Sequence, residues 1–174
     1  MAVLRKKETI GRLALEALIL TVGRICDVRA MQWSEIDMGE RLWRARTTVG
    51  RGSDERVRFV PLSEAMIELL ERARRYKRGD TDLVFRGVMR GKQLSVTTLG
   101  KVALDMGYPI TAEGFRTAFA EWAREKTPFP RELREAVLAH ADPRAVAGDD
   151  ACAVRLEERR KLMEAWAGYC EGTE

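Results

Sequence analysis

The sequence is poor in the residues from which metal sites and disulfides are built. Its 174 residues include one histidine and three cysteines. Cys26, Cys152 and Cys170 are odd in number and form no Cys-x-x-Cys pair, which gives a zinc site little support. Unpaired thiols are typical of a reducing compartment, so we expect a cytoplasmic protein.

Long apolar runs and nucleotide-binding glycine motifs are also missing. No apolar run reaches the ~20 residues that cross a bilayer, and the N-terminal segment 1–7 lacks a signal-peptide core, so we expect no membrane partner. No phosphate-loop or dinucleotide motif is present, and the glycines flanking Arg51 fit a hairpin turn. Asp149 and Asp150 are adjacent, so they point apart on a helix and make a poor metal pair. We therefore expect no cofactor.

The charge balance gives limited information about the kind of molecule that the protein binds. The chain carries 31 basic and 27 acidic residues, with a formal charge of +4 and a pI of about 9.1. This balance permits an acidic partner without requiring one, because the two signs are mixed along the chain. Apolar residues make up 45% of the sequence, enough for a sizeable core, so we expect a single domain over residues 1–174.

Capping residues and apolar spacing predict a mostly helical chain. Thr9, Ser63, Ser95 and Thr111 each precede a segment with apolar residues at helical spacing. Alternating segments on either side of a turn at 50–54 predict an antiparallel hairpin. The expected helices cover 9–22, 26–31, 63–76, 95–107, 111 to the prolines at 128 and 130, 131–139 and 156–169, and the expected strands cover 42–48 and 56–60. The predicted fold class is mainly α with a small antiparallel β-sheet (α+β).

Two arginines and the single histidine are the candidate phosphate ligands. Arg24 ends the segment TVGR, Arg116 ends EGFR, and His140 ends LAH about two dozen residues later. A guanidinium is planar and permanently charged, and it can donate paired hydrogen bonds to phosphate oxygens. Two alternatives stay open: Arg24 in an ion pair with Asp27 or another nearby acid, and His140 as a helix C-terminal residue stabilised by the helix dipole.

Six segments in order resemble the catalytic domain of the tyrosine recombinases, the phage integrase family, and most closely the integrases of prophages and genomic islands. They are LILTVGR (18–24), WSEID (33–37), VPLS (60–63), GFR (114–116), LAH (138–140) and EERRKLMEAW (157–166). The resemblance implies a mostly α domain with a small sheet, preceded in the family by a separate DNA-clamping domain. Only about eight residues precede the first expected helix, so we expect that domain to be absent and the chain to be a fragment or a truncated remnant.

The resemblance also implies roles for individual residues. In the family, two arginines and a histidine bind the scissile phosphate, and a lysine on the hairpin protonates the leaving 5′ oxygen. A tyrosine attacks phosphorus, and neither a metal nor a nucleotide is needed. By resemblance, Arg24, Arg116 and His140 are the phosphate ligands of this chain.

Several family positions carry other residues here. Glu113 stands in place of the histidine that begins the His-x-x-Arg motif, and Arg51 is the residue nearest to the missing hairpin lysine. The tyrosine position falls on Asp150 when it is counted without gaps, and Pro143 replaces a usual glycine. Arginine holds its proton too firmly to be a good general acid. We therefore expect a degraded active site.

The expected function is that of a DNA-binding domain of this family, associated with DNA integration and site-specific recombination, that does not perform strand transfer by itself. Duplex DNA is the expected partner, and assembly of copies of the chain on DNA is left open. One alternative is an active recombinase whose nucleophile comes from another subunit. The other is a helical protein-interaction module that no longer binds DNA, which Glu113 and the interspersed acids favour.

Overall fold

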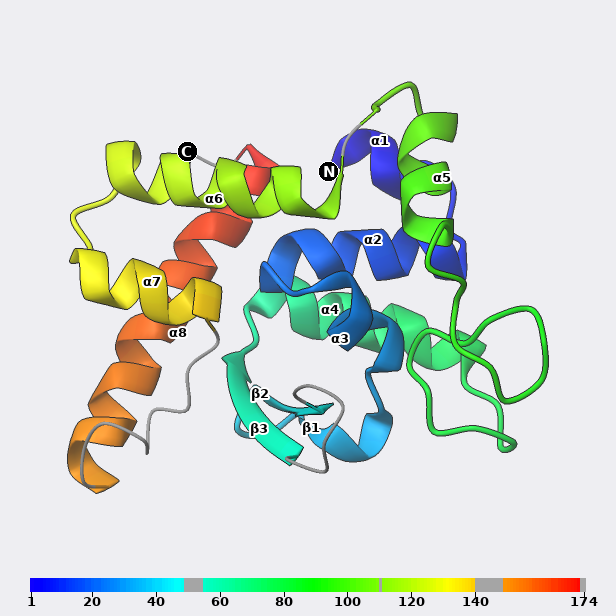
Figure 1. Ribbon diagram of the computed structural model, residues 1–174, viewed down its shortest axis with the longest axis horizontal. Coiled ribbons are helices and arrows are strands. Elements are labelled where there is room, and N and C mark those ends of the chain that lie inside the picture. The colour runs from blue at the N-terminus through cyan, green and yellow to red at the C-terminus, as the bar shows by residue number, and fades with distance from the viewer. Residues whose placement is uncertain (49–54, 110, 140–148, 173–174) are drawn as a thin grey trace.

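Helix α2 (Ile10–Thr21) forms the centre of the computed structural model, and other helices pack around it (Figure 1). The structure describes residues 1–48, 55–109, 111–139 and 149–172. Thr9 caps α2 by accepting a hydrogen bond from the backbone N–H of Arg12 (3.3 Å). Nine of the twelve residues of α2 are buried, which explains why its sequence is apolar on nearly every side.

The remaining helices and strands surround α2 in an order that Figure 1 follows by colour. They are α1 (Ala2–Arg5), α3 (Ile25–Ala30), η1 (Trp33–Glu35), β1 (Ile36–Asp37), β2 (Leu42–Thr48), β3 (Glu55–Pro61), α4 (Glu64–Ala73), η2 (Arg74–Tyr76), α5 (Thr98–Asp105), α6 (Ala112–Lys126), α7 (Arg131–Ala139) and α8 (Asp149–Glu171). In the part of the chain that the structure describes, no helix is long and apolar enough to cross a membrane.

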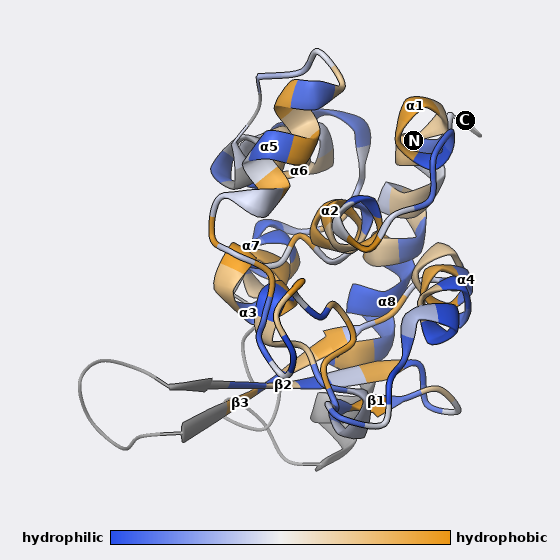
Figure 2. Cartoon of the chain, turned by 90° about the vertical axis from the view of Figure 1, so that its right-hand side faces the viewer, coloured by the Kyte–Doolittle hydropathy of each residue, from blue (hydrophilic) through white to orange (hydrophobic). Residues whose placement is uncertain are grey.

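A three-stranded antiparallel sheet, in the order β1-β2-β3, lies beside the helices. Trp43 pairs with Val60, and Ala45 pairs with Arg58. Trp43, Ala45 and Val60 are buried, while β2 and β3 project from the helical body (Figure 2). Because side chains alternate along a strand, Arg58 lies on the same face of β3 as the buried Val60.

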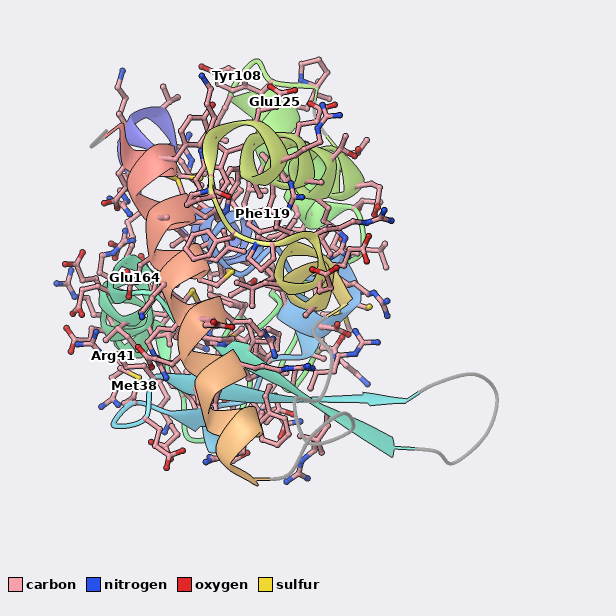
Figure 3. All side chains as sticks on the ribbon, turned by 90° about the vertical axis from the view of Figure 1, so that its left-hand side faces the viewer. Met38, Arg41, Tyr108, Phe119, Glu125 and Glu164 are labelled. Atoms are coloured by element: carbon pink, nitrogen blue, oxygen red, sulfur yellow. The ribbon has the colours of Figure 1, made fainter. Side chains whose placement is uncertain are left out.

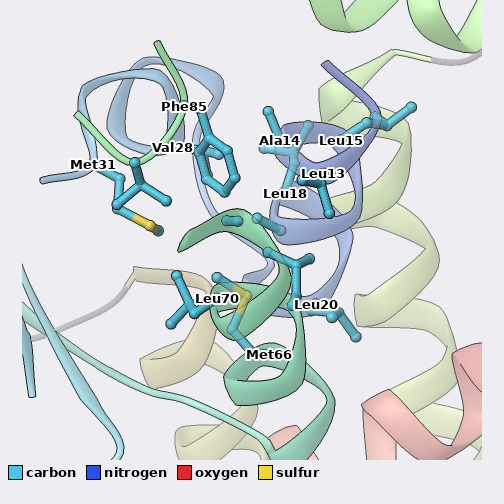
Figure 4. Packing of buried hydrophobic residues seen from close by; sticks show 14 of the residues in the cluster. Leu13, Ala14, Leu15, Leu18, Leu20, Val28, Met31, Met66, Leu70 and Phe85 are labelled. Carbon is cyan, nitrogen blue, oxygen red and sulfur yellow. The ribbon is translucent and has the colours of Figure 1, made fainter. Parts of the chain in front are cut away.

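The larger of two apolar clusters surrounds α2. It joins side chains of α2 to those of α3, α4 and the segment after η2, as Figure 4 shows for Leu13, Leu18, Val28, Met66 and Phe85. Ser63 caps α4 by accepting a hydrogen bond from the backbone N–H of Met66 (3.3 Å), which fixes where α4 begins against α2.

The smaller cluster lies between α6, α7 and α8. Phe119 of α6 points into it (Figure 3) and meets the ring of Trp166 edge to face, with ring centroids 5.4 Å apart. The indole N–H of Trp166 donates to the backbone oxygen of Ile19 (2.9 Å). This bond joins α8 to α2 at Ile19, whose side chain packs against both clusters.

The predicted fold class is confirmed, but several boundaries were wrong. The helix expected to begin at Ser95 begins at Thr98, and the Ser95 hydroxyl instead lies within hydrogen-bonding distance of the hydroxyls of Thr97 and Thr98. The last helix begins at Asp149 rather than near Leu156. Helix α1 and strand β1 were not predicted, because elements of four and two residues are too short to show a period.

Candidate functional site

Arg24 lies at a sharp reversal of the chain between α2 and α3. Val22, which ends α2, has a left-handed backbone (φ 52°), an unfavourable conformation for a β-branched residue. At Gly23, an added Cβ would lie 2.9 Å from Thr21 Oγ1 and 3.0 Å from Val28 Cγ2, so only glycine fits without a shift. The exposed Arg24 then occupies the N-cap position of α3. The tight turn thus brings a guanidinium to the surface directly after a buried helix.

Arg116, in the first half of α6, joins two segments that are far apart in the sequence. One terminal nitrogen of its guanidinium donates to the backbone oxygen of Val22 and the other to that of Leu138, both at 2.6 Å. The side chain is only 13% exposed. Each terminal nitrogen carries two hydrogens, so beyond these two bonds each has one further hydrogen that could reach a ligand. Arg116 therefore fixes the end of α2, and with it the approach to Arg24, against the end of α7.

Positive charge accumulates around Arg116. Burial lowers the pKa of its guanidinium, the charge of Glu113 opposes this, the charges of Arg24 and Arg58 lower the pKa further, and Asp27 raises it. Arginine stays protonated in proteins, so the three guanidinium groups are charged together at neutral pH. An anion placed between them would relieve this repulsion.

Asp27 is the carboxylate within this positive cluster, and its partner is Arg58. Asp27 Oδ2 lies 3.1 Å from a terminal nitrogen of Arg58, with the two side chains 6% and 13% exposed. The thiol of Cys26 donates to the other carboxylate oxygen (3.4 Å). Burial, followed by the charge of Asp27, raises the pKa of Cys26. The ion pair of Arg24 with Asp27, which the sequence left open, is not formed: among the described residues Asp27 pairs with Arg58.

Arg58 is the residue that sequence reasoning missed. The signal was present, because the period-two pattern places Arg58 on the same face of β3 as the buried Val60. An arginine on the inward face of a strand needs a carboxylate partner. Which carboxylate it meets depends on the packing of α3 against β2, and the local sequence does not reveal that contact.

Glu113 lies one helical turn before Arg116 and points mostly into solvent. Its side chain is 83% exposed, and its carboxylate is 3.9 Å from Arg116 Nε. This exposed and distant pair compensates the charge of Arg116 only weakly. Glu113 would nevertheless place a negative charge near any anion held by Arg116.

The other predicted site residues fall partly or wholly outside the described residues. Arg51 and His140 lie outside them, although α7 ends at Ala139, directly before His140. Asp150 lies in the first turn of α8, and its side chain is outside the described part. The structure thus links Arg116 to Val22, two residues before Arg24, and leaves the shared site of Arg24 and Arg116 and the placement of Arg51, His140 and the Asp150 carboxylate as predictions.

Comparison with known proteins identifies relatives along nearly the whole chain. The model of the phage integrase family matches residues 1–147. The integrase of Shigella phage Sf6 is 28% identical over 170 residues, covering 93% of this chain and 42% of the phage protein. The prophage integrase IntS of Escherichia coli K12 is 26% identical with the same coverage. The chain thus spans about two fifths of the length of these relatives.

A solved structure supports the fold. The XerA recombinase superimposes with a TM-score of 0.57 at 18% identity, covering 88% of this chain and 64% of the recombinase. At this identity the likeness supports the mostly helical fold with its small sheet. With the family model matching residues 1–147 of 174, the chain belongs to the phage integrase family.

Proposed function

We propose that this chain binds the phosphate backbone of duplex DNA through Arg24 and Arg116, as part of an integrase that acts in DNA integration and site-specific recombination. The observation that carries the proposal is the nearly buried Arg116, which bonds to the Val22 oxygen two residues before the exposed Arg24 and whose pKa the charges of Arg24 and Arg58 lower. A phosphodiester would offset the excess positive charge and accept the further hydrogens of the Arg116 terminal nitrogens. His140 is the third proposed ligand, because it directly follows α7, whose Leu138 carbonyl oxygen Arg116 holds.

We propose further that strand transfer by the isolated chain is impaired. Arg51 would donate a proton poorly to a leaving oxygen, because its pKa is too high for general acid catalysis. A carboxylate of Asp150 would approach the phosphate as one anion approaching another, which raises the barrier to attack. Glu113 would add negative charge where a transition state needs positive charge.

A cytoplasmic location and assembly of several copies on DNA belong to the same proposal. Cys26 and Cys170 are free thiols, as expected in a reducing compartment. Recombination acts on more than one phosphate, whereas Arg24 and Arg116 of one copy form one candidate site. Sedimentation of the protein with and without duplex DNA measures whether copies assemble on it.

Fluorescence anisotropy with a labelled duplex tests DNA binding. The expected dissociation constant at physiological salt is of the order of 1 to 100 μM, and it should rise steeply with salt because bound phosphates release counterions. Arg24→Ala should weaken binding while thermal unfolding stays unchanged, since Arg24 is exposed. It is a sharper test than Arg116→Ala, which would also remove two partly buried hydrogen bonds to backbone carbonyl oxygens.

Arg131→Ala is the matched control, because this arginine is 78% exposed and lies at the far end of α7 from Leu138. It removes the same charge from another part of the surface. Equal losses for Arg24→Ala and Arg131→Ala would show that only net charge matters. Absence of binding at low salt would favour the protein-interaction module.

A further inference from the structure

The segment between η2 and α5 contains a closed basic turn that protrudes from the molecule, at the right-hand edge of Figure 1. The backbone N–H of Gly87 donates to the Lys92 oxygen (2.6 Å), and Arg86 pairs with Gln93. A Cβ at Gly87 would lie 2.5 Å from the Gln93 oxygen, and Gly91 has a φ of 66°. Gly87 leaves no room for a Cβ and Gly91 favours glycine because of its positive φ, so the sequence allows this tight turn.

The turn and the preceding residues enclose a hollow of about 250 Å³ rich in arginine. Its lining includes Arg78, Asp80, Arg86, Val88, Met89 and Arg90. Arg86 Nε donates to the backbone oxygen of Tyr76 (3.3 Å), which holds this guanidinium in place. Arg90 pairs with Asp80 (3.1 Å) yet remains 86% exposed, so its charge still faces solvent. Three guanidinium groups therefore share one carboxylate at the hollow.

The composition of the turn identifies the class of partner. The segment from Lys77 to Lys92, with both lysines counted, has five basic residues and two acidic ones. Val88 is fully exposed and Met89 is 72% exposed, directly beside these cations. An excess of positive charge complements a polyanion, and apolar side chains between cations suit the sugar faces between DNA phosphates. Charge complementarity thus favours duplex DNA over an apolar protein surface.

The turn is bonded to α3, the helix that Arg24 precedes as its N-cap. Arg29, near the end of α3, donates from Nε to the backbone oxygen of Leu94 (2.6 Å). The six residues of α3 span about 9 Å, since the rise is about 1.5 Å per residue. The four-residue step from Leu94 back to Arg90 spans at most about 14 Å. The extended Arg29 side chain, its hydrogen bond and the Leu94 carbonyl add about 10 Å. The hollow therefore lies within roughly ten base pairs of Arg24, at about 3.4 Å per base pair along DNA.

We propose that Arg78, Arg86 and Arg90 form a second phosphate contact on the same duplex, within about ten base pairs of the phosphate held at Arg24 and Arg116. This inference rests on the proposed DNA binding and extends it to a surface that the candidate site does not include. It predicts that the two contacts contribute separately to the salt dependence of binding.

The test compares two double variants on a 24-base-pair duplex. Arg78→Ala/Arg90→Ala removes two proposed phosphate contacts. Arg124→Ala/Lys126→Ala removes the same charge from exposed positions at the end of α6. The slope of log K against log salt should fall by about 2 for the first variant, since each phosphate contributes about 0.9, and its affinity at 0.1 M salt should fall roughly tenfold or more. The control should keep the slope of the parent protein.

Circular dichroism melts of all proteins verify that each variant is folded. Equal slopes for the two double variants would overturn the second contact while leaving DNA binding through Arg24 intact. Absence of any binding by the parent protein would instead overturn the proposed function, and the second contact with it. The two failures are therefore distinguishable in one set of titrations.

Discussion

At the scale of single residues, the nearly buried carboxylate of Asp27 stabilises a cluster of positive charge. Asp27→Asn keeps the shape of the side chain but leaves Arg58 without its charge partner. We expect the free energy of unfolding in urea to fall by about 3 kcal/mol, the usual cost of breaking a buried ion pair. Added phosphate should restore stability more in the variant than in the parent, because an anion bound to the folded state replaces the missing charge.

Asp37→Asn is the control for this prediction. Asp37 also pairs with an arginine, and its carboxylate lies 3.4 Å from a terminal nitrogen of Arg44. Both of these side chains, however, are more than a third exposed. Solvent screens such a pair, so the variant should lose far less stability than Asp27→Asn. Similar losses for the two variants would contradict the assignment of Asp27 as the compensating charge.

At the scale of elements, α8 is joined to α2 by the indole of Trp166. Trp166→Phe keeps an aromatic ring against Phe119 but removes the hydrogen bond to the Ile19 oxygen. Trp122→Phe makes the same change in the same cluster, and Trp122 Nε1 has no hydrogen-bond partner among the described residues. We expect Trp166→Phe to destabilise the protein by about 1 kcal/mol more than Trp122→Phe does, the net value of one hydrogen bond.

Chemical denaturation of the two variants, followed by circular dichroism, measures the difference. The comparison cancels most of the cost of replacing an indole by a smaller ring, because both tryptophans are nearly buried. If Trp122→Phe were the more destabilised variant, ring packing rather than the bond to α2 would hold α8 in place.

The helix boundaries that could be predicted from the sequence are those marked by an N-cap residue. Thr9, Ser63 and Thr111 each accept the backbone hydrogen bond expected of an N-cap residue. Ser95 failed because its hydroxyl engages neighbouring hydroxyls, and the chain enters the helix two residues later than a cap there requires.

In the candidate site, too, some features could be predicted from the sequence and others could not. The arginines could be found from their segments, but two contacts could not. Arg116 bonds to the carbonyl of Val22, 94 residues away, and Arg58 pairs with Asp27, 31 residues away. Such partners are chosen by tertiary packing, and neither periodicity nor capping encodes them.

At the scale of the whole molecule, α8 connects the apolar interior to the sheet. Arg159 donates to the backbone oxygen of Phe59 (2.6 Å), and the Glu164 carboxylate accepts the backbone N–H of Glu64 at the start of α4 (2.9 Å). Figure 3 shows Glu164 on the side of α8 that faces α4, with Arg41 below it. A helix held at several points along its length places its first turn, which contains Asp150, relative to β3.

Because Asp150 stands at the family's tyrosine position by gapless count, the last prediction is that the protein forms no covalent 3′-phosphotyrosyl link with DNA. A nicked suicide substrate, read on a denaturing gel, measures such a link directly. Asp150→Tyr alone should restore little, because Glu113 and the absence of a hairpin lysine would still impair charge stabilisation and protonation of the leaving group. Any acyl phosphate formed by Asp150 itself would be prone to hydrolysis, giving nicks without rejoining. A covalent band from the unmodified protein, mapped to Tyr76, Tyr108 or Tyr169, would show that the family's chemistry survives with another nucleophile.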